Sequence, residues 1–231
     1  MAEIVEERIN FASGPLQLTG ILSYPDRAAP ELAVLVCSPH PHFAGDMDNN
    51  VVRAVAGRLA RHSVVLRFDY RGVGQSEIAL GPGVSVFDYW TEIEETRDYH
   101  DPVTDVEAAA QALTAATASL GVGFCVVGYS FGAATGILFG HKADRVMKMV
   151  ALAPPLGKVS FDFLSTCLKP SLHLVGKNDF LYSDEGLKEY RQAVGPAAKV
   201  VVLNEADHFF RGDEDMLAQE VDRFLCGTHQ A

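Results

Sequence analysis

The sequence has little positive charge and no long apolar run. Its 19 Lys and Arg residues are outnumbered by 30 Asp and Glu residues, which gives a formal net charge of -11. Nucleic acids and anionic membranes would repel such a surface on average, so we expect neither as a partner. No apolar stretch approaches the roughly 18 residues of a membrane span. The first residues, MAEIVEERIN, lack a signal-peptide pattern, so we expect a cytoplasmic protein.

Cysteine is also scarce. The four cysteines, Cys37, Cys125, Cys167 and Cys226, form no CxxC pair, and two of them lie inside apolar runs. Reduced, buried thiols are therefore expected rather than a disulfide framework. What is present suits one globular unit: 231 residues, of which 48% are hydrophobic, can bury a sizeable core. We predict a single domain over residues 1–231.

Short apolar runs alternate with helical patterns along the chain. Two initial runs, joined by a turn at Gly14 and Pro15, predict an antiparallel hairpin. The later runs are typical of buried parallel strands, and the segments between them have apolar residues at helical spacing. The sequence thus predicts an α/β fold with a mostly parallel eight-stranded sheet and helices on both faces. Strands are expected at 4–11, 16–24, 32–38, 64–70, 124–128, 146–153, 171–176 and 199–204, and helices at 50–61, 103–118, 131–143, 185–194 and 214–226.

Residues 76–102 form an irregular segment with aromatic side chains and an acidic patch. A segment this long without clear periodicity is often functional. One interpretation is a short cap insertion at about 77–102 over a pocket, lined by Phe87 or Trp90. The other is an ordinary surface excursion that is packed by its own aromatic residues.

The chemistry begins at Gly128-Tyr129-Ser130-Phe131-Gly132, which fits the G-x-S-x-G nucleophile elbow. In this sharp strand-to-helix turn the serine hydroxyl is raised above the sheet, and glycines are required because larger side chains would collide. An apolar strand precedes the motif and a helix of small residues follows it, as the elbow requires. Ser130 is therefore the candidate nucleophile.

A serine nucleophile needs a base, and the base needs a carboxylate to orient it. Asp179 and His208 each follow a predicted strand, and sites in open parallel sheets gather at the carboxyl ends of the strands. The chain order Ser130, Asp179, His208 is that of α/β-hydrolases and differs from both chymotrypsin-like and subtilisin-like proteases.

These motifs, together with SPHPHFAGDMDNNVV at 38–52 and FDYRGVGQS at 68–76, resemble the α/β-hydrolase superfamily over nearly the whole chain. The likeness is greatest to small bacterial hydrolases related to dienelactone hydrolases and carboxylesterases. It implies an α/β-hydrolase fold, a Ser-His-Asp catalytic triad, no cofactor, and hydrolysis of esters or related acyl compounds. In RGVGQS, the glycines are expected to form turns rather than a phosphate loop.

The His-Pro loop at 38–43 has a predicted place in this site. Acyl transfer creates an oxyanion, which is usually bound by the amide after the nucleophile and by one from the loop after the third strand. Phe131 supplies the first amide. Pro39 and Pro41 have no amide hydrogen, which leaves His40 or His42, and the resemblance favours His42.

His40, Tyr129, Phe87 and Trp90 are further candidates for substrate contact. No zinc-ligand spacing accompanies His40 and His42, so we expect no metal in this loop.

The leading functional hypothesis is a carboxylesterase-type serine hydrolase acting on small-molecule esters with small to medium acyl chains. A peptidase or thioesterase would use the same triad, and a noncatalytic binding protein could share the scaffold. The sequence does not specify an oligomeric state, although a homodimer is the commonest assembly in general.

Overall fold

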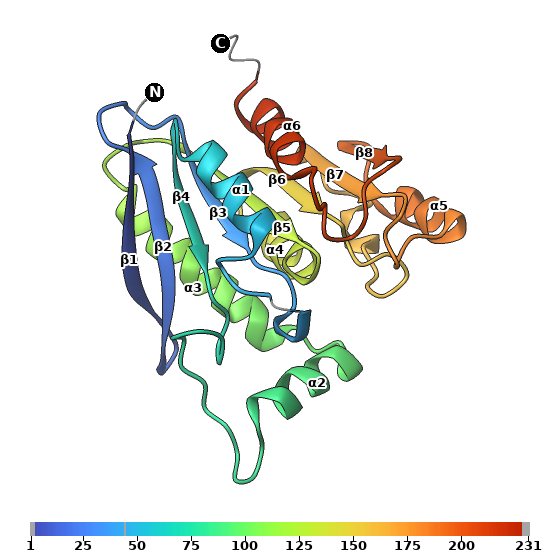
Figure 1. Ribbon diagram of the computed structural model, residues 1–231, viewed down its shortest axis with the longest axis horizontal. Coiled ribbons are helices and arrows are strands. Elements are labelled where there is room, and N and C mark those ends of the chain that lie inside the picture. Colours follow the sequence, from blue (N-terminus) through green and yellow to red (C-terminus); the bar gives the residue numbers. More distant parts are fainter. Residues whose placement is uncertain (1–2, 44, 228–231) are drawn as a thin grey trace.

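A long hairpin opens the fold and leads into a single sheet. The structure, a computed structural model, describes residues 3–43 and 45–227, and within them eight strands pair in the order β1-β2-β4-β3-β5-β6-β7-β8 (Figure 1). The strands are β1 (Ile4–Ser13), β2 (Leu16–Pro25), β3 (Leu32–Cys37), β4 (Ser63–Phe68), β5 (Gly123–Tyr129), β6 (Val146–Leu152), β7 (Ser171–Gly176) and β8 (Ala198–Leu203).

The pairing confirms the predicted mostly parallel sheet. β1 pairs with β2, and β2 with β4, in antiparallel orientation, whereas every pair from β4 to β8 is parallel. The β1–β2 turn contains Gly14 at a φ of 58°, a conformation that glycine adopts without steric cost. Because the strands from β3 onward run in one direction, the loops after them meet at one edge of the sheet.

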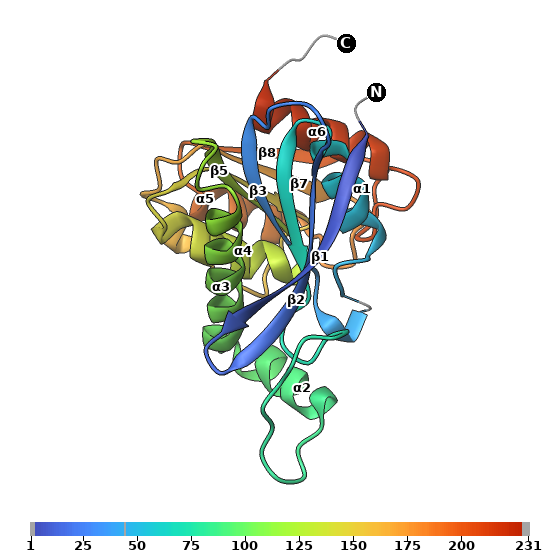
Figure 2. The same ribbon diagram turned by 90° about the vertical axis from the view of Figure 1, so that its left-hand side faces the viewer.

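Helices cover both faces, as the sequence predicts. The helices are α1 (Asn50–Leu59), α2 (Val86–Thr96), α3 (His100–Ala116), α4 (Phe131–Lys142), α5 (Asp184–Ala193) and α6 (Glu214–Cys226). Figure 2, which views the sheet from its β1 edge, shows α1 and α6 on one side of the sheet and α3 and α4 on the other. No helix in the described part of the chain has both the length and the hydrophobicity required to cross a membrane.

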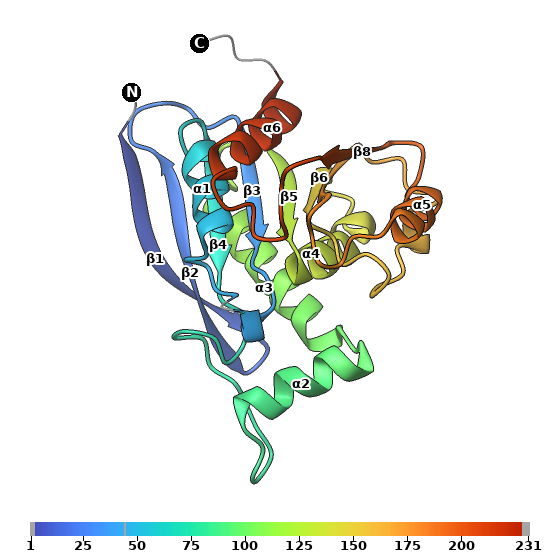
Figure 3. The same cartoon turned by 45° about the vertical axis from the view of Figure 1, so that its right-hand side comes forward.

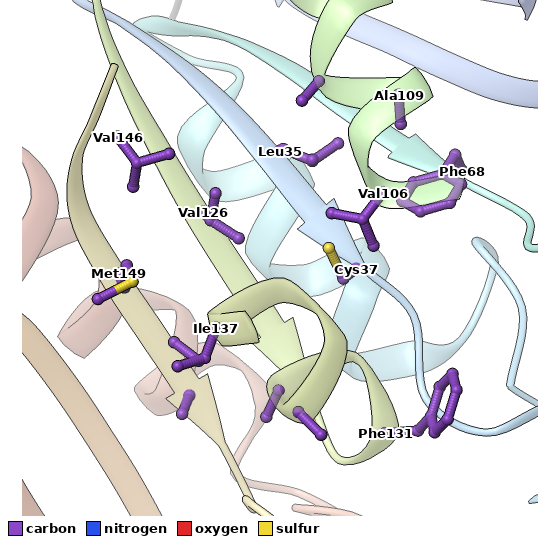
Figure 4. Close-up of a cluster of buried hydrophobic side chains, with 14 of the residues drawn as sticks. Leu35, Cys37, Phe68, Val106, Ala109, Val126, Phe131, Ile137, Val146 and Met149 are labelled. Atoms are coloured by element: carbon purple, nitrogen blue, oxygen red, sulfur yellow. The ribbon is translucent and has the colours of Figure 1, made fainter. Parts of the chain in front are cut away.

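Because successive side chains of a strand point to opposite faces of the sheet, the core is divided into two clusters. In β3, Val34 and Val36 belong to the apolar cluster under α1 and α6, whereas Leu35 belongs to the cluster under α3 and α4. Figure 4 shows the second cluster, in which side chains of β3, β5 and β6 face Val106 of α3 and Ile137 of α4. Complete burial of one such aliphatic side chain contributes about 1.5–3 kcal/mol, so both helix layers are fixed to the sheet.

The segment predicted to be irregular contains a helix, so that part of the prediction is wrong. α2 begins with a capping box: the Ser85 hydroxyl accepts a hydrogen bond from the Asp88 amide, and the Asp88 carboxylate accepts one from the Ser85 amide. Only Trp90 and Ile93 of this helix are buried, which is why the apolar periodicity is too short to recognise. Figure 3 shows α2 lying beyond the sheet edge at which the parallel strands end.

A buried ion pair attaches α3 to the sheet. Asp105, whose side chain is fully buried, accepts hydrogen bonds from the Arg71 guanidinium at 2.8 and 3.0 Å, from the Arg71 amide and from the Ser13 hydroxyl. Asp101, one turn earlier on α3, also pairs with Arg71, but 42% of its side chain is exposed. The Asp105 carboxylate on α3 therefore connects three segments: α3 itself, the β1–β2 hairpin and the loop that follows β4.

We expect Asp105→Ala to lower the free energy of unfolding by about 3–5 kcal/mol, because it leaves a buried guanidinium without its charge partner. Asp101→Ala, the matched control on the same arginine, should cost less than about 1 kcal/mol, because water screens an exposed pair. Urea unfolding of both variants measures the two losses. Equal losses would contradict a dominant role for the buried carboxylate.

Candidate active site

Ser130 lies on a strained turn between β5 and α4. Its φ of 54° and ψ of -112° are unusual for a residue with a side chain. Two close backbone contacts explain the flanking glycines: a Cβ on Gly128 would lie 2.1 Å from the Gly132 carbonyl oxygen, and one on Gly132 would lie 2.2 Å from the Cys37 carbonyl oxygen. The turn can form only because both positions lack side chains.

Ser130, His208 and Asp179 come together in one hydrogen-bonded chain. Ser130 Oγ lies 3.0 Å from His208 Nε2, and His208 Nδ1 lies 2.7 Å from Asp179 Oδ2. A carboxylate only accepts hydrogen bonds, so Nδ1 carries the proton and Nε2 accepts from the serine hydroxyl. The second Asp179 oxygen accepts from the Leu181 amide at 2.8 Å. This arrangement can remove the serine proton and stabilise the resulting imidazolium.

The loops that carry Asp179 and His208 are hydrogen-bonded to each other. The amide of Asn178 donates to the Ala206 carbonyl at 3.0 Å, which joins the loop after β7 to the loop after β8. Asp207, beside the base, accepts from the Phe209 amide and so stabilises the turn of its own loop. Neighbouring parallel strands deliver both loops to the same edge of the sheet (Figure 1).

The Tyr129 side chain contacts the loop that carries His208. Its hydroxyl donates to the carbonyl oxygen of His208 at 2.9 Å, and its side chain is buried. Tyr129 is one of the residues expected to contact substrate, whereas in the structure its hydroxyl is directed to this backbone carbonyl. Its position next to Ser130 in the motif gives no sign of the contact, because the partner lies 79 residues further along the chain.

The His-Pro loop approaches the same site with its imidazoles packed among aromatic rings. His40 is 4% exposed and lies edge-on to Trp90 and Phe131, with centroid distances of 5.5 and 5.0 Å. Burial lowers the pKa of His40 to about 4, so it is neutral at physiological pH. His42 stacks on Phe87 at 4.3 Å and contacts the Phe87 carbonyl oxygen through Nε2 at 3.1 Å.

The amide of His42, the predicted second oxyanion donor, has a partner in this conformation. It donates to His40 Nδ1 at 3.2 Å. The amide of Phe131 begins α4, where the first amides of a helix have no partner within the helix and the helix dipole is positive. The first donor is thus available, whereas the second must leave the His40 imidazole to bind an oxyanion.

A cavity of about 280 Å³ opens over Ser130 and His208. Its walls are mainly aromatic and aliphatic, with a few charged groups, and comprise His40, Phe43, Glu94, Arg97, Tyr99, Ser130, Phe131, Ala134, Pro155, Lys158, Phe180, Leu181 and His208. A wider hollow of about 810 Å³ adjoins it and shares Arg97, Tyr99 and Lys158. The smaller cavity contains the reactive groups, so it is the candidate acyl pocket.

Only one of the four predicted substrate contacts lines this cavity. His40 does, whereas Tyr129, Phe87 and Trp90 do not. Trp90 is 1% exposed because it packs in the core, and Phe87 is 66% exposed beside His42. The insertion still reaches the cavity through Glu94 and Arg97, whose side chains pair at 2.9 Å. Neither residue is predicted from the sequence, because α2 buries too few apolar residues to show a helical pattern.

Known proteins share this architecture. A sequence model described as the alpha/beta hydrolase family matches residues 33–224. A curated relative, an uncharacterized protein of Rickettsia prowazekii (strain Madrid E), is 27% identical over 200 residues, which cover 83% of this chain and 77% of that protein.

Solved structures agree with this match. An alpha-beta serine hydrolase homologue from Coxiella burnetii superposes with a TM-score of 0.78 at 24% identity, covering 95% of this chain and 97% of the other. A dienelactone hydrolase from Anabaena variabilis superposes with a TM-score of 0.71 at 16% identity, covering 96% of both chains. At these identities the likeness shows the fold, and it confirms the fold expected from the motifs.

The contact between Tyr129 and the base loop generates a prediction. Tyr129→Phe should slow labelling of Ser130 by a fluorophosphonate about fivefold, because one hydrogen bond of about 1 kcal/mol no longer holds the His208 backbone in place. The labelling rate measures this loss at fixed probe concentration. Tyr182→Phe, which removes a hydroxyl bonded to Asp184 instead, is the matched control and should label at the wild-type rate. Equal rates for all three proteins would refute the positioning role.

Proposed function

Because the chain belongs to the alpha/beta hydrolase family, we propose that it is a serine hydrolase of the carboxylesterase type. The substrate is a small-molecule ester with a small to medium acyl chain. The observation that carries the proposal is the continuous chain from Ser130 Oγ through His208 to Asp179, with contacts of 3.0 and 2.7 Å.

The proposed reaction begins with proton transfer to the base. His208 Nε2 takes the Ser130 proton as Oγ attacks the ester carbonyl carbon, and the Asp179 carboxylate stabilises the imidazolium. The tetrahedral intermediate collapses to an acyl-enzyme when His208 returns the proton to the leaving alcohol. Water, deprotonated by His208, then attacks the acyl carbon, and Ser130 is released with the carboxylic acid product.

The oxyanion of each tetrahedral intermediate is bound by the amides of Phe131 and His42. The amide of His42 exchanges its 3.2 Å bond to the neutral His40 imidazole for a bond to the charged oxygen, and hydrogen bonds to charged acceptors are the stronger ones. One such donor contributes about 3 kcal/mol to transition-state stabilisation.

The size of the cavity favours short acyl groups. A volume of about 280 Å³ lies just below the roughly 300–1,000 Å³ that is usual for small-molecule pockets. Apolar walls at Phe43, Phe180 and Leu181 suit an acyl chain, and the adjoining hollow beyond Tyr99 and Lys158 gives the alcohol part of the ester room to leave.

The decisive experiment compares wild type with Ser130→Ala on nitrophenyl esters of increasing acyl length. We expect turnover to fall by at least about 10³-fold, since only binding and the oxyanion donors remain. Wild type, but not the variant, should be labelled by a fluorophosphonate. Ester turnover near the wild-type rate in Ser130→Ala would refute the assignment of Ser130 as the nucleophile. If wild type cleaves matched thioesters or amides faster than esters, the substrate is a thioester or an amide.

The wall contributed by α2 generates a second prediction. Deleting the whole insertion would remove the core residues Trp90 and Ile93 and could unfold the protein. The double variant Glu94→Ala with Arg97→Ala instead enlarges the cavity and leaves the core intact. We expect the preference for longer over shorter acyl chains to rise about tenfold in kcat/KM, the effect of roughly one or two methylene contacts.

The matched control is Glu92→Ala with Glu95→Ala, on the solvent side of the same helix. It should keep the wild-type chain-length preference. If the cavity variant keeps that preference as well, α2 is not a cap over the acyl pocket.

A further inference from the structure

Three side chains that can bind a metal meet at the sheet edge opposite the candidate active site. Glu31 precedes β3, His62 precedes β4, and Cys226 is the last residue of α6. They lie at the amino ends of the parallel strands, where α6 ends above the start of the sheet (Figure 1). One carboxylate oxygen, one imidazole nitrogen and the sulfur all lie within 4.8 Å of one another.

The spacing of these atoms suits a tetrahedral ion. Cys226 Sγ lies 3.7 Å from His62 Nδ1. Two ligands at the usual Zn–S and Zn–N distances, about 2.3 and 2.0 Å, are about 3.5 Å apart at a tetrahedral angle. The sulfur and the nitrogen are thus close to a first coordination shell, and the Glu31 oxygen, which lies within 4.8 Å of both, moves inward to complete it.

The orientation of His62 is fixed by a second, independent set of contacts. His62 Nε2 lies 2.9 Å from Asp222 Oδ1, and the other Asp222 oxygen accepts from Arg58 at 2.7 Å. Asp222 is 8% exposed and lies one helical turn before Cys226, on the same side of α6. Metal-binding histidines almost always have a carboxylate or another acceptor beside their second ring nitrogen, and Asp222 occupies that place here. On the other side of the ring, His62 Nδ1 lies 3.7 Å from the Cys226 sulfur and 3.3 Å from Ser63 Oγ.

We propose that Glu31, His62 and Cys226 bind a zinc ion, with Asp222 and Arg58 holding the histidine. Nitrogen, sulfur and carboxylate oxygen are the ligands that zinc uses in proteins. Glu31 is exposed, so water completes the tetrahedron from the solvent side. The negative charges of Glu31 and Asp222 near this cluster attract a cation.

The ion joins segments that are far apart in the sequence. His62 and Cys226 are separated by 164 positions, and Glu31 brings in the loop between β2 and β3. Because this edge is remote from Ser130, zinc stabilises the fold and takes no part in ester hydrolysis. Binding energy at a site that the unfolded chain lacks is stabilisation energy.

The test uses full-length protein that has been treated with EDTA and then titrated with Co²⁺, which replaces zinc and reports its ligands. We expect one equivalent to produce the charge-transfer absorption of a cobalt–thiolate bond and the visible bands of a tetrahedral ion. Zn²⁺ should abolish both signals. At a concentration a hundredfold above Kd, Zn²⁺ should raise Tm by roughly 5–10 °C.

Variants assign the ligands. Cys226→Ser should lose the thiolate band, whereas Cys167→Ser, which removes another partly buried cysteine, should keep it. The exposed change Glu31→Gln should weaken binding at least tenfold without unfolding the protein, and Asp222→Asn should weaken it about 10–100-fold.

Two controls separate this site from the hydrolase reaction. Ser130→Ala should bind Co²⁺ as wild type does, and EDTA should leave wild-type ester hydrolysis unchanged. The proposal is overturned if wild type binds neither ion, if the thiolate band persists in Cys226→Ser, or if Glu31→Gln binds as tightly as wild type.

Discussion

The candidate site depends on the close packing of three backbone segments around Ser130. β5, α4 and the end of β3 approach one another so closely that a single methyl group on Gly128 or Gly132 would lie about 2 Å from a carbonyl oxygen. This contact keeps Ser130 in its strained conformation. It also brings the His-Pro loop, which begins just after Cys37, against the amino end of α4. One packing constraint thus determines both the position of Ser130 and that of the His-Pro loop.

Asp179 and His208 are held by different means. The loops that carry them are joined by a backbone hydrogen bond, and the Tyr129 hydroxyl connects the His208 loop to the strand that precedes Ser130. The three reactive groups are therefore linked through backbone contacts as well as through their own side chains. Such redundancy keeps a catalytic geometry rigid when the groups come from loops.

Much of this could be predicted from the sequence because the relevant signals are local. The strands are short apolar runs, the elbow is a pentapeptide, and Asp179 and His208 directly follow strands. What could not be predicted depends on distant partners. The Tyr129 hydroxyl meets His208, the His42 amide meets a neighbouring imidazole, and the Glu31, His62 and Cys226 cluster gathers three segments that only the fold brings together. α2 could not be predicted from the sequence because it buries only two residues.

α2 contributes to both the core and the cavity wall. One side of this helix places Trp90 and Ile93 in the core, where Trp90 contacts His40 and Phe131. Another side places Glu94 in the cavity wall, and the left-handed Arg97 that ends the helix completes this part of the wall. A change in the buried residues would shift the wall and loosen the His-Pro loop together, whereas a change at Glu94 or Arg97 alters the wall alone. The half-buried Glu94 and Arg97 can therefore vary while Trp90 and Ile93 keep the core packed.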